Sequence, residues 1–298
     1  MRGLLEGELG TTEGEEEGCY TGWMIPHISH SQYKAYTSCP RSWYLSKVRQ
    51  GEEIQSWYIP IGSAVHDAIE EHVDYLHGNR EVPVASMETY FYPLIEKQMR
   101  IEPDLSKWKA GGPEAAPITH DKALQRAKDC FERALQELED IEVWEVEYDA
   151  SGPLPGLSVP VKGFIDIVGE HKKKGPVVVD WKTGSTKPDK SQLETYAALL
   201  KHNDHSKMFC VDQFDFGRYV MLAPGAPNTR YVDLSDIDPA AIGAKYQAVV
   251  DKMNEKLYAA NAGFGCRFCF QAENCLVNKG MTQRAVYYDR SADDGYPF

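Results

Sequence analysis

An aspartate and a lysine stand two positions apart at the end of a run of valines, in the stretch VVVDWKTG (177–184). Side chains two apart on a strand face the same way, so Asp180 and Lys182 are predicted to share one side and their neighbours the other. A second aspartate, Asp166, stands between two isoleucines in the preceding segment FIDI. Two carboxylates in apolar surroundings are costly unless a cation compensates them, and hard oxygen ligands suit Mg²⁺ or Mn²⁺. The pattern predicts a divalent-metal site with Lys182 beside it, able to position a water or neutralise a phosphate oxygen.

A D-x-K triplet by itself is more often a surface hairpin with solvated charges, because such triplets are common by chance, so the companion motifs matter. Gln192 and Tyr196 would share one face of a predicted helix because they are four residues apart. Four motifs occur in this order: His66 in GSAVHDAIE, the G-x-x-D of Gly163 to Asp166, the D-x-K of Asp180 to Lys182, and the Q-x-x-x-Y of Gln192 to Tyr196. Together they resemble the RecB-like branch of the PD-(D/E)XK nuclease superfamily.

The resemblance implies metal-dependent cleavage of phosphodiester bonds by a Mg²⁺- or Mn²⁺-dependent DNA exonuclease. It also implies an α/β fold with a restriction-endonuclease-like core, in which helices flank a central mixed β-sheet. The metal ligands that it implies are His66, Asp166, Asp180 and the backbone carbonyl of Trp181. Lys182 would orient the attacking water, and Gln192 and Tyr196 would support the lysine or contact the DNA backbone. Glu147, in VWEVEY, either joins this site or is a charge on the face of a strand.

The chain contains seven cysteines, an odd number, and no secretory signal, which argues against a disulfide scaffold and favours metal ligation. CRFCFQAENC supplies Cys266, Cys269 and Cys275, and Cys39 in TSCPRSWYL is the best candidate for a fourth thiolate. This arrangement resembles the iron–sulfur RecB-like nucleases, namely AddB-type nuclease domains and the Cas-four-type exonucleases of phages and CRISPR systems. The resemblance implies a [4Fe–4S] cluster, with structural Zn²⁺ as the alternative.

The formal net charge of −13 argues against a broadly basic surface, although a single basic channel is compatible with it. The candidate DNA contacts are Arg41, Lys47, Arg49 and Tyr196. The expected partner is DNA, in particular single-stranded ends, with recombination or CRISPR-adaptation proteins as further candidates and oligomerisation left open. The alternative function is a non-catalytic DNA-end-binding adaptor stapled by an iron–sulfur or zinc site.

The chain has no apolar run of about 18 residues and no recognisable signal peptide. We therefore expect no membrane association and a cytoplasmic location, in a bacterium or a phage-infected host cell.

Three regions are predicted: an acidic flexible tail (1–22), a nuclease core with an N-terminal helical part (23–262), and a cysteine region with a tail (263–298) that packs with Cys39. Hydrophobic periodicity predicts the elements that position the motif residues. The predicted helices cover 31–48, 62–78, 86–100, 121–140, 189–203 and 238–260. The predicted strands cover 142–150, 157–170, 175–184, 208–222 and 229–234. Cys130 and Cys210 are interpreted as ordinary core thiols within these elements.

Overall fold

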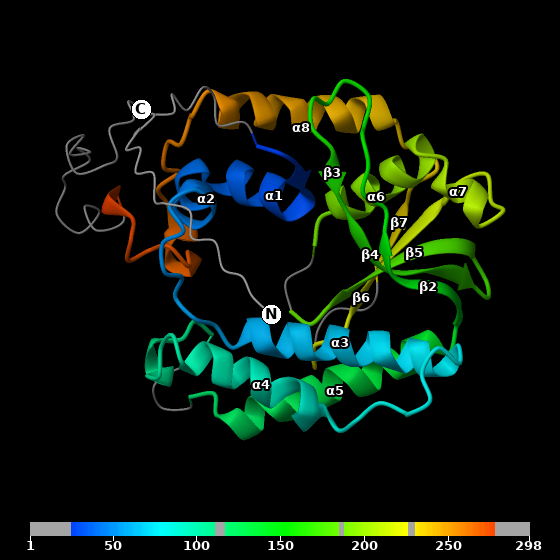
Figure 1. The fold of residues 1–298 in the computed structure, drawn as a ribbon, viewed down its shortest axis with the longest axis horizontal. Helices are drawn as coiled ribbons and strands as arrows, with labels where there is room; N and C mark the ends of the chain where they lie inside the picture. Colours follow the sequence, from blue (N-terminus) through cyan, green and yellow to red (C-terminus); the bar gives the residue numbers. More distant parts are fainter. Residues whose placement is uncertain (1–24, 111–116, 185–187, 226–229, 278–298) are drawn as a thin grey trace, which may run out of the picture.

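The computed structural model describes residues 25–110, 117–184, 188–225 and 230–277, and a mixed β-sheet forms its centre (Figure 1). The strand order is β2-β4-β5-β6-β7, in which β5 and β6 run parallel and every other neighbouring pair is antiparallel. The strands are β2 (Ile141–Asp149), β4 (Phe164–His171), β5 (Gly175–Lys182), β6 (Phe216–Met221) and β7 (Arg230–Asp233). Two shorter strands, β1 (Ile28–Ser29) and β3 (Val161–Lys162), pair with each other in parallel.

Helices cover both faces of the sheet. A layer of α3, α4 and α5 lies on one side, and α6 and α8 lie on the other (Figure 1). The helices are α1 (His30–Ser38), α2 (Pro40–Lys47), α3 (Tyr58–Leu76), α4 (Met87–Met99), α5 (His120–Leu138), α6 (Ser191–His202), α7 (His205–Met208) and α8 (Pro239–Asn254), with 3₁₀ turns η1 (Leu105–Lys107) and η2 (Phe264–Phe268). The predicted α/β class, with a mixed sheet between helices as in a restriction-endonuclease-like core, is confirmed. Among the described residues, none of the helices combines the length and apolarity needed to cross a membrane.

Strand β5 shows how the sheet separates its two cores. Val177, Val179 and Trp181 pack against the layer of α3, α4 and α5, whereas Val178 packs in the core on the other side. Lys182 hydrogen-bonds a side chain of α6, so it lies on the face opposite Trp181. The alternation predicted for the D-W-K triplet is therefore confirmed, and it delivers the charged side chains to one face.

The prediction of one strand over 208–222 is wrong in its first half. Only Phe216–Met221 is a strand, because the preceding apolar residues build a local aromatic cluster instead. Phe209 stacks on Trp144 and lies edge-on to Phe214. Cys210 has a left-handed backbone (φ 54°) and is exposed, so its interpretation as a core thiol is also wrong, whereas Cys130 is buried as expected.

The helix predicted over 31–48 is two helices, α1 and α2, divided at Cys39, whose backbone is extended before Pro40. Other predicted boundaries shift as well. The strand predicted over 157–170 begins only at Val161 and is interrupted at Gly163, where a β-carbon would come within 2.9 Å of Leu199 Cδ1 and would require that side chain of α6 to move. The helix predicted over 62–78 begins at Tyr58. The helix predicted to reach residue 260 ends at Asn254, shortly before Lys256 takes a left-handed backbone with φ 59°.

Segments from both ends of the described chain lie together beside α1 and α2. The Asn261 side chain donates a hydrogen bond to the carbonyl of Ser38 at 3.0 Å, and the Gln271 side chain donates to the carbonyl of Gly51 at 3.2 Å. The backbone N–H of Ile54 bonds to a carbonyl of the same C-terminal segment, at 3.0 Å. These contacts join the N-terminal helical part to the cysteine region. The predicted tail over 1–22 and the last residues of the region 263–298 lie outside the described residues.

Candidate active site

The two aspartates of the motifs lie on adjacent strands and are both buried. Asp166 on β4 is 9 % exposed and Asp180 on β5 is 2 % exposed. One Asp166 carboxylate oxygen accepts the backbone N–H of Trp181 at 2.7 Å, which ties the side chain to the residue after Asp180. Burial, and next the negative charge of Asp180, raise the pKa of Asp166 to about 7. The charge of Asp180 therefore disfavours ionisation of Asp166.

Lys182 compensates part of this charge and is held by a short chain of side chains. Its ammonium lies 2.5 Å from a carboxylate oxygen of Asp180 and donates to Oε1 of Gln192 at 3.0 Å. Gln192 in turn donates to the hydroxyl of Tyr196 at 2.8 Å. Gln192 and Tyr196 are on α6 and reach the site because they share one helical face. The structure thus brings the D-x-K and Q-x-x-x-Y motifs together.

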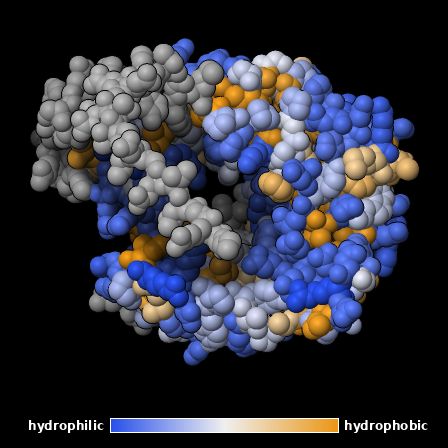
Figure 2. Space-filling view, viewed as in Figure 1, coloured by the Kyte–Doolittle hydropathy of each residue, from blue (hydrophilic) through white to orange (hydrophobic). Residues whose placement is uncertain are grey.

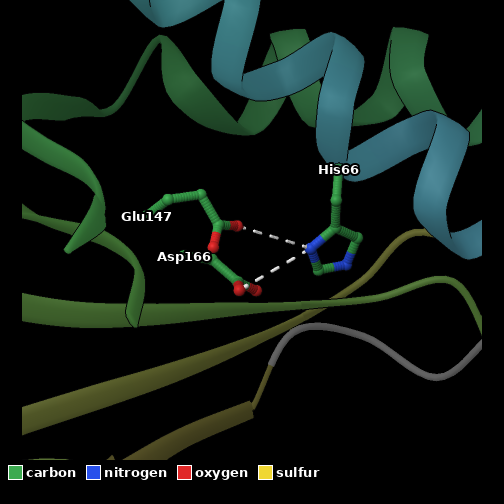
Figure 3. A group of neighbouring side chains, drawn as sticks. All are labelled: His66, Glu147 and Asp166. Atoms are coloured by element: carbon green, nitrogen blue, oxygen red, sulfur yellow. Dashed lines mark ion pairs between the residues drawn. The ribbon is translucent and has the colours of Figure 1, made fainter. Parts of the chain in front are cut away.

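His66 reaches the same place from α3, as Figure 3 shows together with Glu147 and Asp166. Its Nδ1 lies 3.6 Å from Asp166 and 3.9 Å from Glu147, and one ligand atom of each of these three residues lies within 4.8 Å of the others. Gly62 allows α3 to pass close to the end of β5, since a β-carbon there would be 3.3 Å from Thr183 Oγ1. Side chains from α3, β2 and β4 therefore lie close together, although His66 is about eighty residues or more from the other two in the sequence.

Glu147 is the functional candidate that the sequence left open. It lies on β2 between Val146 and Tyr148, which pair with the residues on either side of Asp166. Its φ of 47° is left-handed, an uncommon backbone for a residue that is not glycine, and such backbones cluster at active sites. This turn of the backbone cannot be read from VWEVEY, whose pattern predicts an ordinary strand.

The charges around His66 make the site attractive to a cation. Burial lowers the pKa of His66, but its interaction with the Glu147 carboxylate and the charges of Asp166 and Asp180 outweigh burial and raise the pKa to about 9. The protonated His66 thus partly neutralises the negative charges of Asp166, Asp180 and Glu147. An imidazole and several carboxylates are a ligand set that suits Mg²⁺ or Mn²⁺, so the residues present fit such an ion.

The four cysteines singled out by spacing also lie together. They line a cavity of about 490 Å³, between the end of α1 and η2: Cys39, Cys266, Cys269 and Cys275. The backbone N–H groups of Asn261 and Gly263 and the hydroxyl of Ser42 lie 3.3 to 3.5 Å from three of these sulfurs. Hydrogen bonds to sulfur stabilise a bound thiolate, so the arrangement fits a sulfur-ligated centre.

The cations proposed to contact DNA are not equivalent. Arg41 is 4 % exposed and its guanidinium lies over the ring of Tyr44, so it supports the packing of α2 rather than presenting charge to solvent. Lys47 and Arg49 are exposed. Tyr196 is buried, and its hydroxyl accepts a hydrogen bond from Gln192, which also contacts Lys182. Only Lys47 and Arg49 remain accessible candidates for phosphate contacts.

Comparisons with known proteins identify the family. A family model described as the PD-(D/E)XK nuclease superfamily matches residues 27–275, and the chain belongs to this superfamily. The chain is 23% identical to the Gene 69 protein of Mycobacterium phage L5, over 60% of this chain and 72% of that protein. It is also similar to the crystal structure of SSO0001, with 16% identity and a TM-score of 0.34, over 62% of this chain and 81% of that chain. Nucleases of this superfamily use divalent metal ions, and the carboxylates and histidine described above are of the kind such ions need.

Proposed function

We propose that the protein is a divalent-metal-dependent DNA exonuclease that degrades DNA from single-stranded ends. The observation that carries the proposal is a pair of buried aspartates on neighbouring strands, with His66 of α3 3.6 Å from Asp166 and Lys182 2.5 Å from Asp180. Processing of DNA ends in recombination, repair, replication or CRISPR spacer acquisition is the setting that this activity would serve.

In this mechanism the aspartates, His66 and the backbone carbonyl of Trp181 would hold the metal, with Glu147 as a further ligand. A bound Mg²⁺ or Mn²⁺ would polarise the scissile phosphate and lower the pKa of an attacking water. The ammonium of Lys182 would orient this water and neutralise charge that develops on phosphate oxygens. Gln192 holds the ammonium in place through its 3.0 Å hydrogen bond, and Tyr196 holds Gln192.

The shape of the molecule supports a single strand as the substrate. Figure 2 shows a hollow at the centre of the face viewed, bordered on the side of the sheet by hydrophilic side chains. In Figure 1 the same region lies between α3, which carries His66, and the helices α1 and α2. An unpaired strand needs less room than a duplex. The exposed Lys47 at the end of α2 and Arg49 just after it could contact the phosphates of such a strand.

The test of the proposed function uses three DNA substrates with the same protein preparation. End-labelled linear single-stranded DNA with Mn²⁺ should be degraded to short products, whereas closed circular single-stranded DNA should persist and blunt duplex should react slowly. Chelation of the metal should stop the reaction. Cleavage of circles at the same rate would make the protein an endonuclease. Binding of linear ends without hydrolysis would favour the adaptor alternative.

We further propose that the four cysteines hold a [4Fe–4S] cluster. The four cysteines line one cavity, which is compatible with a centre held by all four thiolates, and the resemblance to iron–sulfur nucleases favours a cluster over a single Zn²⁺ ion. Cys269→Ala is expected to remove the visible absorbance and the iron of anaerobically purified protein and to lower its melting temperature. The matched control is Cys210→Ala, which changes an exposed cysteine elsewhere and should retain both. Zinc without iron in the unchanged protein would refute the cluster.

Metal binding is also expected to release a proton from His66. Its pKa of about 9 leaves the imidazole protonated at pH 8, whereas a ligating nitrogen must be neutral. Calorimetry of Mn²⁺ binding at pH 8, in buffers with different enthalpies of ionisation, should give about one proton released. His66→Asn should abolish this release, and His72→Asn on the same helix should leave it unchanged. Equal proton release in both variants would place the metal elsewhere.

A further inference from the structure

A pocket beside the candidate metal site has no role in the mechanism above. Its volume is about 470 Å³, and it opens between the first turns of α3 and the strand β2. Its lining includes Tyr58 and Ile59 from the first turn of α3, which we call the aromatic end, and three carboxylates, which we call the acidic end: Asp67, Glu70 and Glu147. His66 also lines it. Because His66 and Glu147 belong to both places, whatever enters this pocket lies next to the metal.

The aromatic end is exposed but held in position. Tyr58 and Ile59 are 49 % and 46 % exposed, although large apolar side chains gain free energy from burial. The guanidinium carbon of Arg126 lies 5.7 Å from the centre of the Tyr58 ring. Arg126 also donates to the carbonyl of Thr183 at 3.3 Å, and Thr183 directly follows the catalytic lysine. The Tyr58 ring is thus linked through Arg126 to the end of the catalytic strand.

The acidic end decides which part of a nucleotide the pocket accepts. Asp67 and Glu70 line it together with Glu147, and burial and the neighbouring carboxylates raise the pKa of both Asp67 and Glu70. A phosphate group would be repelled by these carboxylates. A nucleobase is neutral and can stack its π-face on a tyrosine, so carboxylates that repel a phosphate do not exclude it. The phosphate would then remain near Lys182 and the metal.

We propose that this pocket is a nucleobase subsite, in which Tyr58 stacks on the unpaired base next to the scissile phosphate. The subsite rests on the proposed nuclease function and adds a reason for the preference for single strands, because a base paired in a duplex cannot leave its stack to enter. Asp67 and Glu70 keep phosphate out, and Arg126 positions the tyrosine. Sequence-independent recognition follows, since every base has a π-face.

The test compares Tyr58→Ala with Tyr58→Phe and with Tyr75→Ala, which removes another exposed tyrosine at the far end of the same helix. Binding of a single-stranded oligonucleotide is measured by fluorescence anisotropy with Ca²⁺ in place of Mg²⁺, and cleavage is measured in single turnovers with Mn²⁺. Tyr58→Ala should weaken binding or slow cleavage roughly 5- to 150-fold, the range for loss of one stacked base. Tyr58→Phe and Tyr75→Ala should remain near the unchanged protein.

A second experiment uses an oligonucleotide with an abasic residue next to the scissile phosphate. The missing base should lower the cleavage rate of the unchanged protein by about the same factor. It should not lower the rate of Tyr58→Ala further, because the stacking partner is already absent. Hydrolysis of methyl p-nitrophenyl phosphate, which has no base, should be equal in all variants. This small substrate separates loss of the subsite from damage to the metal site.

Each contrary result has a distinct meaning. If Tyr58→Ala matches Tyr75→Ala while the unchanged protein degrades DNA, the subsite is refuted and the nuclease stands. If the unchanged protein cleaves nothing but Tyr58→Ala still loses binding with Ca²⁺, the subsite stands and the nuclease is refuted. If Glu70→Gln raises the Mn²⁺ concentration required for cleavage and Tyr58→Ala has no effect, the pocket binds a cation instead of a base.

Discussion

Replacing Asp180 with asparagine is expected to reduce metal-dependent hydrolysis of DNA by about 10³-fold or more. Asp180 is 2 % exposed and contacts the Lys182 ammonium at 2.5 Å, so the substitution removes a carboxylate that we propose as a metal ligand and also removes the charge partner of the lysine. Lys182→Ala is expected to cause a loss of similar size because the ammonium would stabilise charge that develops in the transition state. The two losses should not add, because both side chains act on one reacting centre.

The measurement is the single-turnover rate on end-labelled single-stranded DNA with saturating Mn²⁺. Glu142→Gln and Lys97→Ala are matched controls, since both residues are exposed and neither belongs to the site. The melting temperature of each variant shows whether it is folded. Asp180→Asn and Lys182→Ala variants that are folded and cleave at the unchanged rate would rule out this site as the catalytic centre.

Asp166→Asn is expected to stabilise the metal-free protein while it removes activity. Burial and the charge of Asp180 raise the pKa of Asp166 from 3.8 to about 7, so ionisation of this carboxyl opposes folding. In the unfolded chain the same carboxyl ionises near its ordinary pKa. The stability that this one carboxyl contributes is therefore complete below about pH 4 and is lost as pH rises through about 7. An asparagine carries no charge, and its oxygen can still accept the N–H of Trp181.

At pH 8 the asparagine variant should be more stable by about 2 to 4 kcal/mol, which corresponds to a melting temperature higher by roughly 5 to 10 °C. Thermal unfolding in chelator across pH 4 to 8 measures this difference, which should vanish toward pH 4. Saturating Mn²⁺ should reverse the order, because only the unchanged protein gains free energy from the bound ion. If the variant is less stable than the unchanged protein at pH 8 without metal, ionised Asp166 does not destabilise the fold, which contradicts the proposed site.

The motif residues were accessible from the sequence because they depend on short spacings. Strand alternation placed Asp180 and Lys182 on one face, and helical spacing placed Gln192 and Tyr196 on another. Alternating apolar residues and cap signals likewise predicted most helices and strands. The prediction for 208–222 was wrong because an apolar run that suits a strand also suits the packing of Phe209 on Trp144, and a single sequence does not distinguish the two.

The sequence by itself determined which chemical groups the protein has, the elements that carry them, and the family to which it belongs. Only the tertiary structure decided that Glu147 faces His66, that Arg41 is buried, and that Tyr58 stands exposed beside the metal site. The physical reason is that these properties depend on contacts between segments far apart in the chain and on a left-handed backbone at Glu147. Local periodicity carries no information about either.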